Sequence, residues 1–202
     1  MDRRRRLETG DLTRIVVFAA LLAVLGLPGA VTVLGGPVPV TAQTLGVMLA
    51  VAVLGPGRGA AAVAVFLLLV LAGLPLLSGG RGGAGVFAGP SAGFLIGWIL
   101  GAAVVGAIVR FRGRPPVWWR AALGCFAGGA LAVYLVGIPV QAAVTHLPLR
   151  DAAVASAVFL PGDLIKATLA TIITMALWRA YPRAFGVPPR VAPRPGLGPV
   201  AR

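Results

Sequence analysis

The sequence predicts an all-α integral membrane protein, a bundle of six transmembrane helices with both termini in the cytoplasm. Hydrophobic residues make up 58% of the 202 residues and charged residues only 11%, whereas a soluble domain carries about 25% charged residues. The mean hydropathy is +0.96. The basic residues lie mostly between long apolar runs or at the chain termini, which is the usual topological signal of a membrane protein.

Six apolar runs are candidates for membrane spans. A spanning helix needs about 20 mostly apolar residues, with a range of about 17–25. We expect these spans at residues 12–33, 40–54, 60–77, 92–109, 119–140 and 152–180. The second and third are short, and Gly-Pro-Gly-Arg-Gly at 55–59 separates them tightly. The sixth is long for one straight span, and Pro161 predicts a break because proline interrupts a helix interior.

The spans divide the chain into three parts. Residues 1–11 are a basic cytoplasmic tail, residues 12–181 form the six-helix domain, and residues 182–202 are a second cytoplasmic tail rich in proline and arginine. We expect the second tail to be disordered or to lie on the membrane surface. The basic start resembles a signal peptide, but no small-x-small cleavage site precedes Pro28, which predicts a retained first helix.

The arginines predict the orientation. With the N-terminus in the cytoplasm and six spans, fifteen of the seventeen arginines fall on the cytoplasmic side. Only Arg81 and Arg150 fall outside. Arginine and lysine concentrate in cytoplasmic loops, so this topology is favoured over its inverse. Trp118, Trp119 and Trp178 lie beside arginines, as in an interfacial aromatic belt.

The centre of the functional prediction is a pair of charges in the last span. Asp163 is the one acidic residue inside an apolar run, and Lys166, three residues later, is the only lysine of the chain. An ionisable group at membrane depth costs about 3 kcal/mol or more and usually faces the bundle interior. Residues three apart share a helix face. The pair is either a self-neutralising structural element or a ligand site.

Three features favour the ligand site. Pro161 and Gly162 restart the helix just before Asp163, so that the carboxylate lies near a helix N-terminus, where negative charge is favoured. Irregular backbone at membrane depth is tolerated where it lines a cavity. The predicted topology also turns this end of the span outward. A carboxylate accepts hydrogen bonds and an ammonium donates them, so the pair matches a cyclic urea or amide.

Three further polar residues are candidate ligand contacts. Arg81 stands between two pairs of glycines, which let a loop fold closely over a ligand, and its guanidinium suits a carboxylate. The alternative is a solvated loop arginine. Gln43, which with Thr41 opens the second span, and Tyr134 in the fifth offer polar groups in apolar runs. Each could equally form a helix–helix hydrogen bond.

Two small residues in the first span mark a candidate docking face. Ala19 and Ala23 are four residues apart and share one side of the helix. A small-xxx-small pair lets another helix backbone approach closely. This approach serves either packing inside the same bundle or docking of a separate membrane subunit.

Several functions are excluded by composition. The net charge is +13, but the sequence shows no basic helix face and no interleaving of aromatic and basic residues, which a nucleic-acid-binding protein would have. One cysteine, Cys125, allows no intramolecular disulfide, and one histidine with few carboxylates makes no ordinary zinc site. No ATP-binding P-loop, no G-x-S-x-G and no hydrolytic triad occurs. We therefore expect no catalytic residues and no enzyme; an ATPase that drives transport would be another chain.

The order and spacing of five motifs resemble one known family. These are residues 37–46 (PVPVTAQTLG), 54–59 (LGPGRG), 72–75 (AGLP) before the glycine-rich loop, 87–93 (FAGPSAG) and 159–166 (FLPGDLIK). Across residues 12–180 the chain resembles the BioY family, the biotin-specific substrate-binding component of energy-coupling-factor (ECF) vitamin transporters. One departure is Phe94, where the family often has a tyrosine after Gly-Pro-Thr-Gly-Gly.

The resemblance implies a six-helix protein of the bacterial cytoplasmic (inner) membrane that binds biotin from outside. It implies two kinds of partner besides the lipid bilayer, a transmembrane coupling subunit that docks on Ala19 and Ala23 and cytoplasmic ABC-type ATPases. It places Asp163 and Lys166 at the ureido group of biotin, which is the transported ligand and not a cofactor; no cofactor is implied.

Two rival functions follow from the same residues. A proton-coupled secondary transporter would use Asp163 as its proton site, but the ammonium of Lys166 favours the charged carboxylate. A structural membrane subunit would bind no ligand at all, and co-purified biotin would exclude it.

Overall fold

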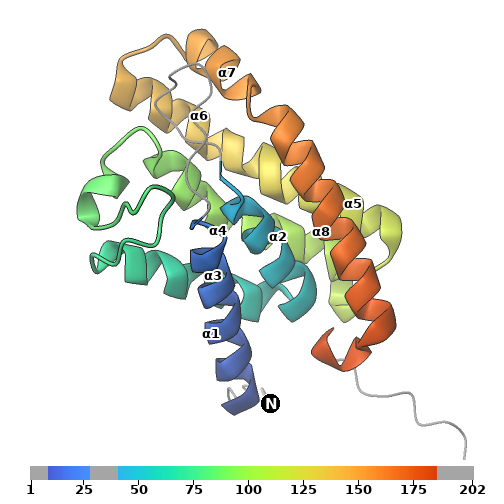
Figure 1. Ribbon diagram of the computed structural model, residues 1–202. Helices are drawn as coiled ribbons and strands as arrows, with labels where there is room; N and C mark the ends of the chain where they lie inside the picture. Colours follow the sequence, from blue (N-terminus) through green and yellow to red (C-terminus); the bar gives the residue numbers. More distant parts are fainter. Residues whose placement is uncertain (1–8, 28–40, 186–202) are drawn as a thin grey trace, which may run out of the picture.

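The structure is a computed structural model that describes residues 9–27 and 41–185. Over these ranges the regular secondary structure is helical, and the only β-type pairing is an isolated bridge between Leu77 and Arg81. The helices are α1 Thr9–Val24, α2 Gln43–Leu54, α3 Pro56–Leu71, α4 Ala92–Val109, α5 Trp118–Phe126, α6 Ala132–Thr145, α7 Leu149–Ala157 and α8 Leu160–Ala180. Figure 1 shows them gathered into one bundle.

The helices run alternately between two ends of the bundle. At one end, called here the basic end, Arg58 at the start of α3 pairs with Asp11 at the start of α1, with 2.7 Å between Nη2 and Oδ2. Arg110 after α4 donates to the carbonyl of Val53 at the end of α2 and to that of Phe185 after α8. The other end, called the pocket end, therefore holds the end of α3 and the starts of α2, α4 and α8 (Figure 1).

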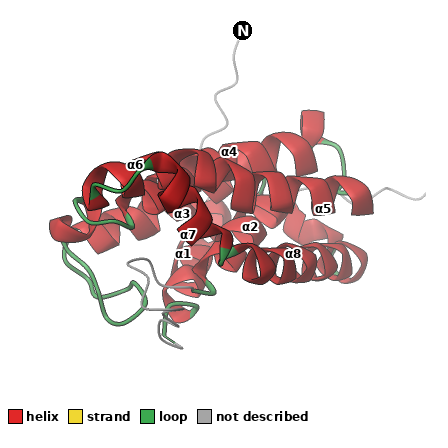
Figure 2. Ribbon diagram, turned by 90° about the horizontal axis from the view of Figure 1, so that it is seen from above, coloured by secondary structure: helices red, strands yellow, loops and turns green. Residues whose placement is uncertain are grey.

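α2 is the central helix. Ten of its twelve residues are buried, and only a helix that is apolar on all sides can be enclosed in this way. Its helical neighbours include α1, α3, α4 and α8. α5 lies beside α8 in both views (Figures 1 and 2).

Glycines set the distance between α4 and α6. Gly93, Gly97 and Gly101 repeat every four residues on one face of α4, so that two backbones approach closely, as small-xxx-small faces do in membrane helices. A Cβ atom at Gly97 would lie 2.9 Å from the carbonyl oxygen of Val133, and one at Gly101 would collide with the carbonyl of Gly128.

Three helical segments are long and apolar enough to cross a bilayer. They are Ala92–Val109, the continuous rod Trp118–Thr145 and Leu160–Ala180. This confirms the predicted helical membrane protein. Two other predicted spans are shorter than expected: α2 has 12 residues and α3 has 16, below the range of about 17–25. The predicted span 60–77 stops early, because Gly73 adopts a φ of +105° that ends the helix.

The predicted break in the sixth span is confirmed, slightly before the expected position. α7 ends at Ala157 and α8 begins at Leu160, which places Pro161 in the first turn of α8. Proline is accepted there because that N–H has no partner inside the helix. The fifth span, expected at 119–140, continues to Thr145, where His146 turns the chain with a φ of +56°. Residues 28–33 of the first predicted span lie outside the described residues.

The folded domain reaches slightly beyond the expected boundary at residue 181. Pro182–Phe185 forms a 3₁₀ turn whose Phe185 is buried and packs edge-on against Trp178 with ring centroids 5.3 Å apart. Arg110 donates to the carbonyl of Phe185 at 2.6 Å and lies 5.5 Å from the centre of its ring. The rest of the predicted tail lies outside the part of the chain that the structure describes.

Candidate ligand-binding site

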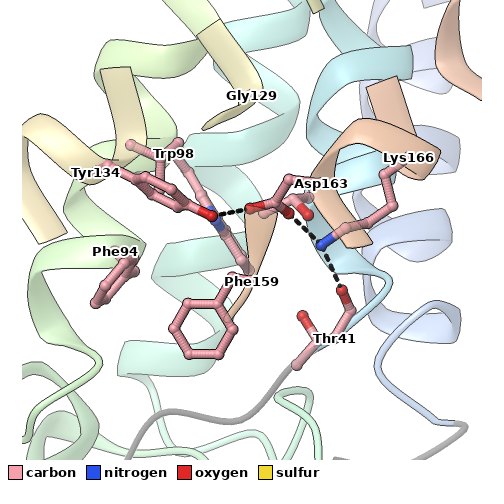
Figure 3. A pocket seen from close by; sticks show the side chains of 10 residues that line it. Thr41, Phe94, Trp98, Gly129, Tyr134, Phe159, Asp163 and Lys166 are labelled. Carbon is pink, nitrogen blue, oxygen red and sulfur yellow. Dashed lines mark hydrogen bonds and ion pairs between the residues drawn. The ribbon is translucent and has the colours of Figure 1, made fainter. Parts of the chain in front are cut away.

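A pocket opens at the pocket end of the bundle, between the starts of α2, α4 and α8 and the middle of the α5–α6 rod. Together with its open mouth it holds about 450 Å³ of empty space. Its lining combines aromatic side chains with two charges, as ligand sites commonly do. The lining residues are Thr41, Thr44, Phe94, Trp98, Gly129, Val133, Tyr134, Phe159, Asp163 and Lys166 (Figure 3).

The two predicted charges lie together in this pocket. Lys166 Nζ is 2.5 Å from Asp163 Oδ1, and the two side chains are only 13% and 5% exposed. Lys166 also donates to the backbone carbonyl of Thr41 at 3.1 Å, and Tyr134 donates its hydroxyl proton to Asp163 Oδ2. These bonds link α8, α6 and the residues before α2 in one polar chain (Figure 3).

This polar chain retains capacity for a ligand. An ammonium has three donors, and Lys166 spends two of them on Asp163 and Thr41. A carboxylate offers about four lone-pair sites, and Asp163 uses one on Lys166 and one on Tyr134 among the described residues. The site can therefore donate one hydrogen bond and accept two within a small area.

Aromatic rings form the wall opposite the charges. Phe94 meets Tyr134 and Phe159 edge-on, with ring centroids 6.3 and 6.2 Å apart, which is the arrangement that aromatic quadrupoles favour. Trp98 lies behind them and packs on Phe66 at 6.1 Å. The wall suits a flat or alicyclic apolar body held beside a polar group.

The floor of the pocket coincides with an irregular stretch of the α5–α6 rod. Residues Ala127–Leu131 form a π-helical turn, a feature that occurs mainly as single turns at functional sites. Gly129 within it lines the pocket, and a Cβ there would strike the side chain of Met48. The bulge and its glycine let α2 and the rod meet closely beneath the pocket.

Thr44 adds a hydroxyl that has no partner of its own. Thr44 lines the pocket, and its Oγ1 is buried and forms no hydrogen bond among the described residues. A buried hydroxyl without a partner costs about 1–3 kcal/mol. Such a group inside a pocket is suited to bind a ligand that restores the missing hydrogen bond.

The structure brings together some predicted site residues and not others. Asp163, Lys166 and Tyr134 line the pocket, but Gln43 and Arg81 do not. The buried amide of Gln43, at the start of α2, donates to the carbonyl of Leu22 in α1 and to that of Leu76 in the loop after α3. This is the helix–helix role that the sequence had left open.

Arg81 lies in the loop between α3 and α4. Its Nε donates to the carbonyl of Ser78 at 3.3 Å, and its backbone pairs with that of Leu77. The side chain is partly exposed. In this arrangement Arg81 belongs to the loop at the pocket end and does not touch the two charges.

The two alanines of α1 face the interior of the chain. Ala19 is 4% exposed and belongs to the main apolar core, and Ala23 is partly buried against the same core. Of the two explanations that the sequence allowed, internal packing is the one this geometry favours.

Sequence reasoning missed Thr44, Phe94, Trp98, Gly129 and Phe159. The three aromatic residues stand in apolar runs, where packing and ligand contact produce the same pattern. Phe159 could have been found from the sequence, because it lies two residues before Pro161, at the predicted break in the helix. Over the described residues no group of three or more His, Cys, Asp or Glu side chains could hold a metal ion.

The all-helical bundle, its long apolar segments and its charged internal pocket define a helical membrane protein with the features of a small-molecule binder. Comparison with known proteins identifies the family. Residues 1–183 match the family described as "BioY family", and the chain belongs to this family.

Curated relatives and a solved structure agree with this assignment. The chain is 44% identical to the biotin transporter BioY of Rhizobium etli over 181 residues, which cover 87% of this chain and 97% of the relative. It is 44% identical to the probable biotin transporter BioY of Bacillus subtilis over 170 residues, or 84% and 91% of the two chains. A crystal structure of the S-component for biotin from an ECF-type ABC transporter matches with a TM-score of 0.81 and 31% identity, covering 89% of this chain and 95% of the other.

Proposed function

We propose that this chain is the biotin-binding membrane component of an ECF-type vitamin transporter and that the pocket around Asp163 and Lys166 is its biotin site. Family membership and the named relatives support the ligand. The observation that carries the site is the buried ion pair, 2.5 Å between Nζ and Oδ1, with unused hydrogen-bonding capacity beside an aromatic wall.

The head group of biotin fits this polar set. Its ureido ring carries one carbonyl oxygen between two N–H groups. Lys166 donates its remaining N–H to the ureido oxygen, and Asp163 accepts one ureido N–H on an unused lone pair. Hydrogen bonds to charged partners are about twice as strong as neutral ones. The rings of Phe94, Trp98 and Phe159 then contact the apolar bicyclic body.

The second ureido N–H requires its own acceptor. Thr44 Oγ1 is the buried hydroxyl of the pocket that lacks a partner among the described residues, and a hydroxyl can accept as well as donate. We assign Thr44 to this role. Tyr134 holds the carboxylate in position through its hydroxyl, so it orients Asp163.

The proposal extends to topology and partners. All six passes (α1, α2, α3, α4, the α5–α6 rod and α8) cross the bacterial cytoplasmic membrane, with the pocket end outside and the basic end in the cytoplasm. The short α2 is enclosed by its neighbours, so it need not match the bilayer thickness alone. The sequence contains no P-loop, so ATPases on separate chains, joined through a transmembrane coupling subunit, supply the energy.

Two objections bear on the rival functions. Against a proton site, both carboxylate oxygens of Asp163 already have partners in the chain, Oδ1 in Lys166 and Oδ2 in Tyr134. A purely structural ion pair has no need of a pocket lined by ten residues. Uptake that persists without ATPases and collapses with the proton gradient would favour the secondary transporter.

The test is equilibrium binding of biotin to the purified protein, its Asp163→Asn variant and its Lys166→Ala variant. We expect the parent to bind and each variant to bind at least about tenfold more weakly, because a hydrogen bond to a charged group contributes about 1.5–3 kcal/mol. A biotin derivative methylated on a ring nitrogen should bind the parent more weakly than biotin does.

Matched controls come from the exposed charges of α7. Asp151→Asn and Arg150→Ala remove an acid and a base at the same end of the bundle, where both residues are exposed, and should leave the biotin affinity unchanged. Thermal unfolding of each sample separates lost binding from lost folding. If folded Asp163→Asn and Lys166→Ala bind as tightly as the parent, the site is wrong; if the parent does not bind, the ligand is wrong.

A further inference from the structure

A second cavity lies at the basic end of the bundle, away from the biotin pocket at the pocket end. It is a groove between the end of α4, the turn Phe111–Gly113 and the start of α5, and it holds about 710 Å³ of open space. Four of its lining residues are apolar or aromatic, and one is charged. They are Ala107, Ile108, Phe111, Trp119 and Arg120.

Arg120 is the unusual member of this lining. It is only 9% exposed, its Nε donates to the carbonyl of Ile108 at 2.9 Å, and its guanidinium lies 5.3 Å from the centre of the Phe111 ring. Its Nη2 is buried and has no hydrogen-bond partner among the described residues. A buried charged donor without a partner is costly, so this nitrogen favours an acceptor that the described residues do not supply.

The electrostatic surroundings favour an anion. The sequence holds no acidic residue between Asp11 and Asp151, and Asp11 is already paired with Arg58. Arg114, in the same connection, is exposed and adds positive charge. In the part of the chain that the structure describes, no carboxylate therefore competes for Arg120.

The shape and position of the groove select the kind of anion. Trp118, Trp119 and Phe111 are 54%, 64% and 49% exposed, and exposed tryptophans beside arginines mark the membrane–water boundary. A groove with apolar walls at that depth faces lipid. The ligand must then carry both a negative head and an apolar body.

We propose that this groove binds an anionic phospholipid of the cytoplasmic leaflet. Its phosphate accepts hydrogen bonds from Arg120, and its glycerol and upper acyl chains lie against Ile108, Phe111 and Trp119. Guanidinium groups suit phosphate oxygens, and basic pockets on the cytoplasmic side of membrane helices recognise lipid head groups. This site rests on the membrane orientation proposed above but does not depend on biotin.

The test is native mass spectrometry of the purified full chain with added phosphatidylglycerol or phosphatidylcholine. We expect one phosphatidylglycerol to be retained preferentially and Arg120→Gln to weaken that retention by about tenfold, as expected for a charge-assisted contact. Ala107→Phe, which fills the groove without touching the charge, should weaken it too. Arg114→Gln, the same change at an exposed position, should have a much smaller effect.

Three outcomes would overturn the lipid site. One is equal retention of phosphatidylglycerol by the parent and Arg120→Gln. Another is displacement of the lipid by millimolar inorganic phosphate, which would make this a site for a free anion. The third is equal retention of phosphatidylcholine. Biotin binding by every variant, measured on the same samples, shows that the fold is intact and keeps this test separate from that of the biotin site.

Discussion

At the residue scale, the central feature is a buried ion pair with more hydrogen-bonding capacity than the described residues use. Burying two charges costs several kcal/mol per ion, and attraction between them often fails to repay it. Tyr134 and the carbonyl of Thr41 satisfy part of the demand, but not all of it. Such a buried ion pair becomes favourable when a ligand makes the hydrogen bonds that are missing.

Thr44 provides a sharp test of that interpretation. Thr44→Val keeps the shape of the side chain and removes a hydroxyl that has no partner in the described structure. We expect unchanged or slightly higher thermal stability, because an unsatisfied buried group is removed. We also expect biotin to bind about 2–13-fold more weakly, since a neutral hydrogen bond contributes about 0.5–1.5 kcal/mol. Unfolding and binding assays measure both.

Thr174→Val is the matched control. Thr174 is also buried with an unpartnered hydroxyl, but it lies further along α8 and does not line the pocket. Its replacement should affect stability in the same direction and leave biotin affinity unchanged. Equal affinity losses in both variants, or none in Thr44→Val, would remove Thr44 from the site.

The sequence could single out the charged residues of the candidate site because charged residues are rare inside membrane spans. Asp163 and Lys166 stand in an apolar run where charge is expensive, so rarity alone singles them out. Phe94 and Trp98 break no rule: an aromatic residue in a membrane helix has the same appearance whether it packs or contacts a ligand. Thr44 was also hidden, because only the folded arrangement leaves its hydroxyl without a partner among the described residues.

At the element scale, the contact between α4 and the α5–α6 rod depends on the glycines that separate them. Gly101 lies against the backbone of Gly128 in the π-helical turn, directly along the rod from the pocket floor at Gly129. The position of this turn therefore depends on a close backbone contact with α4 as well as on side-chain packing.

Gly101→Ala should disrupt this contact. An added Cβ would collide with the carbonyl of Gly128, and overpacking of this kind costs about 1–3 kcal/mol. We expect a lower unfolding temperature and, because the pocket floor shifts, weaker biotin binding. Tryptophan fluorescence during heating and the same binding assay measure the two effects.

Gly57→Ala makes the same chemical change where there is room. Gly57 is an exposed residue in the first turn of α3, and a Cβ there meets nothing within 4 Å. Alanine exceeds glycine in helix propensity by about 1 kcal/mol, so stability should stay the same or rise slightly. If Gly101→Ala behaves like Gly57→Ala, the close approach of α4 and the rod is not what holds the turn.

The sequence predicted helices more reliably than their lengths. The apolar runs and the Pro161 break are local signals, and the structure contains both. The extent of α3 depended on where Gly73 turns the backbone, and the predicted span ran past it. The α5–α6 rod runs past its expected end at residue 140 to Thr145, because Pro139 does not end the helix; packing against α4 keeps the rod continuous.

At the scale of the whole molecule, the two ends differ in charge. Eight described arginines lie on segments of the basic end, and two on segments of the pocket end. The first group is Arg14, Arg58, Arg110, Arg112, Arg114, Arg120, Arg179 and Arg183; the second is Arg81 and Arg150. The arginine count from the sequence had the same asymmetry. Successive helices run in opposite directions, so consecutive loops fall at alternate ends of the molecule.

The basic end also shows how burial acts on one of these charges. Arg110 follows the last residue of α4, and burial, together with the nearby charge of Arg58, lowers its pKa from the usual value. Its contacts with Val53, Phe185 and the Phe185 ring offset that cost. The arginine thereby fixes the chain beyond α8 to the end of α4.

The orientation leads to a labelling prediction. In a Cys125→Ala background, a single cysteine at Gly85, exposed in the pocket-end loop, should react with a membrane-impermeant maleimide on intact cells, because we place that end outside. A cysteine at Arg114, exposed at the basic end, should react only after permeabilisation, because arginine-rich ends face the cytoplasm. The parent, whose single Cys125 is buried, should not react in either state and serves as the control. Labelling of Arg114→Cys but not of Gly85→Cys on intact cells would invert the topology and place the biotin pocket on the cytoplasmic side.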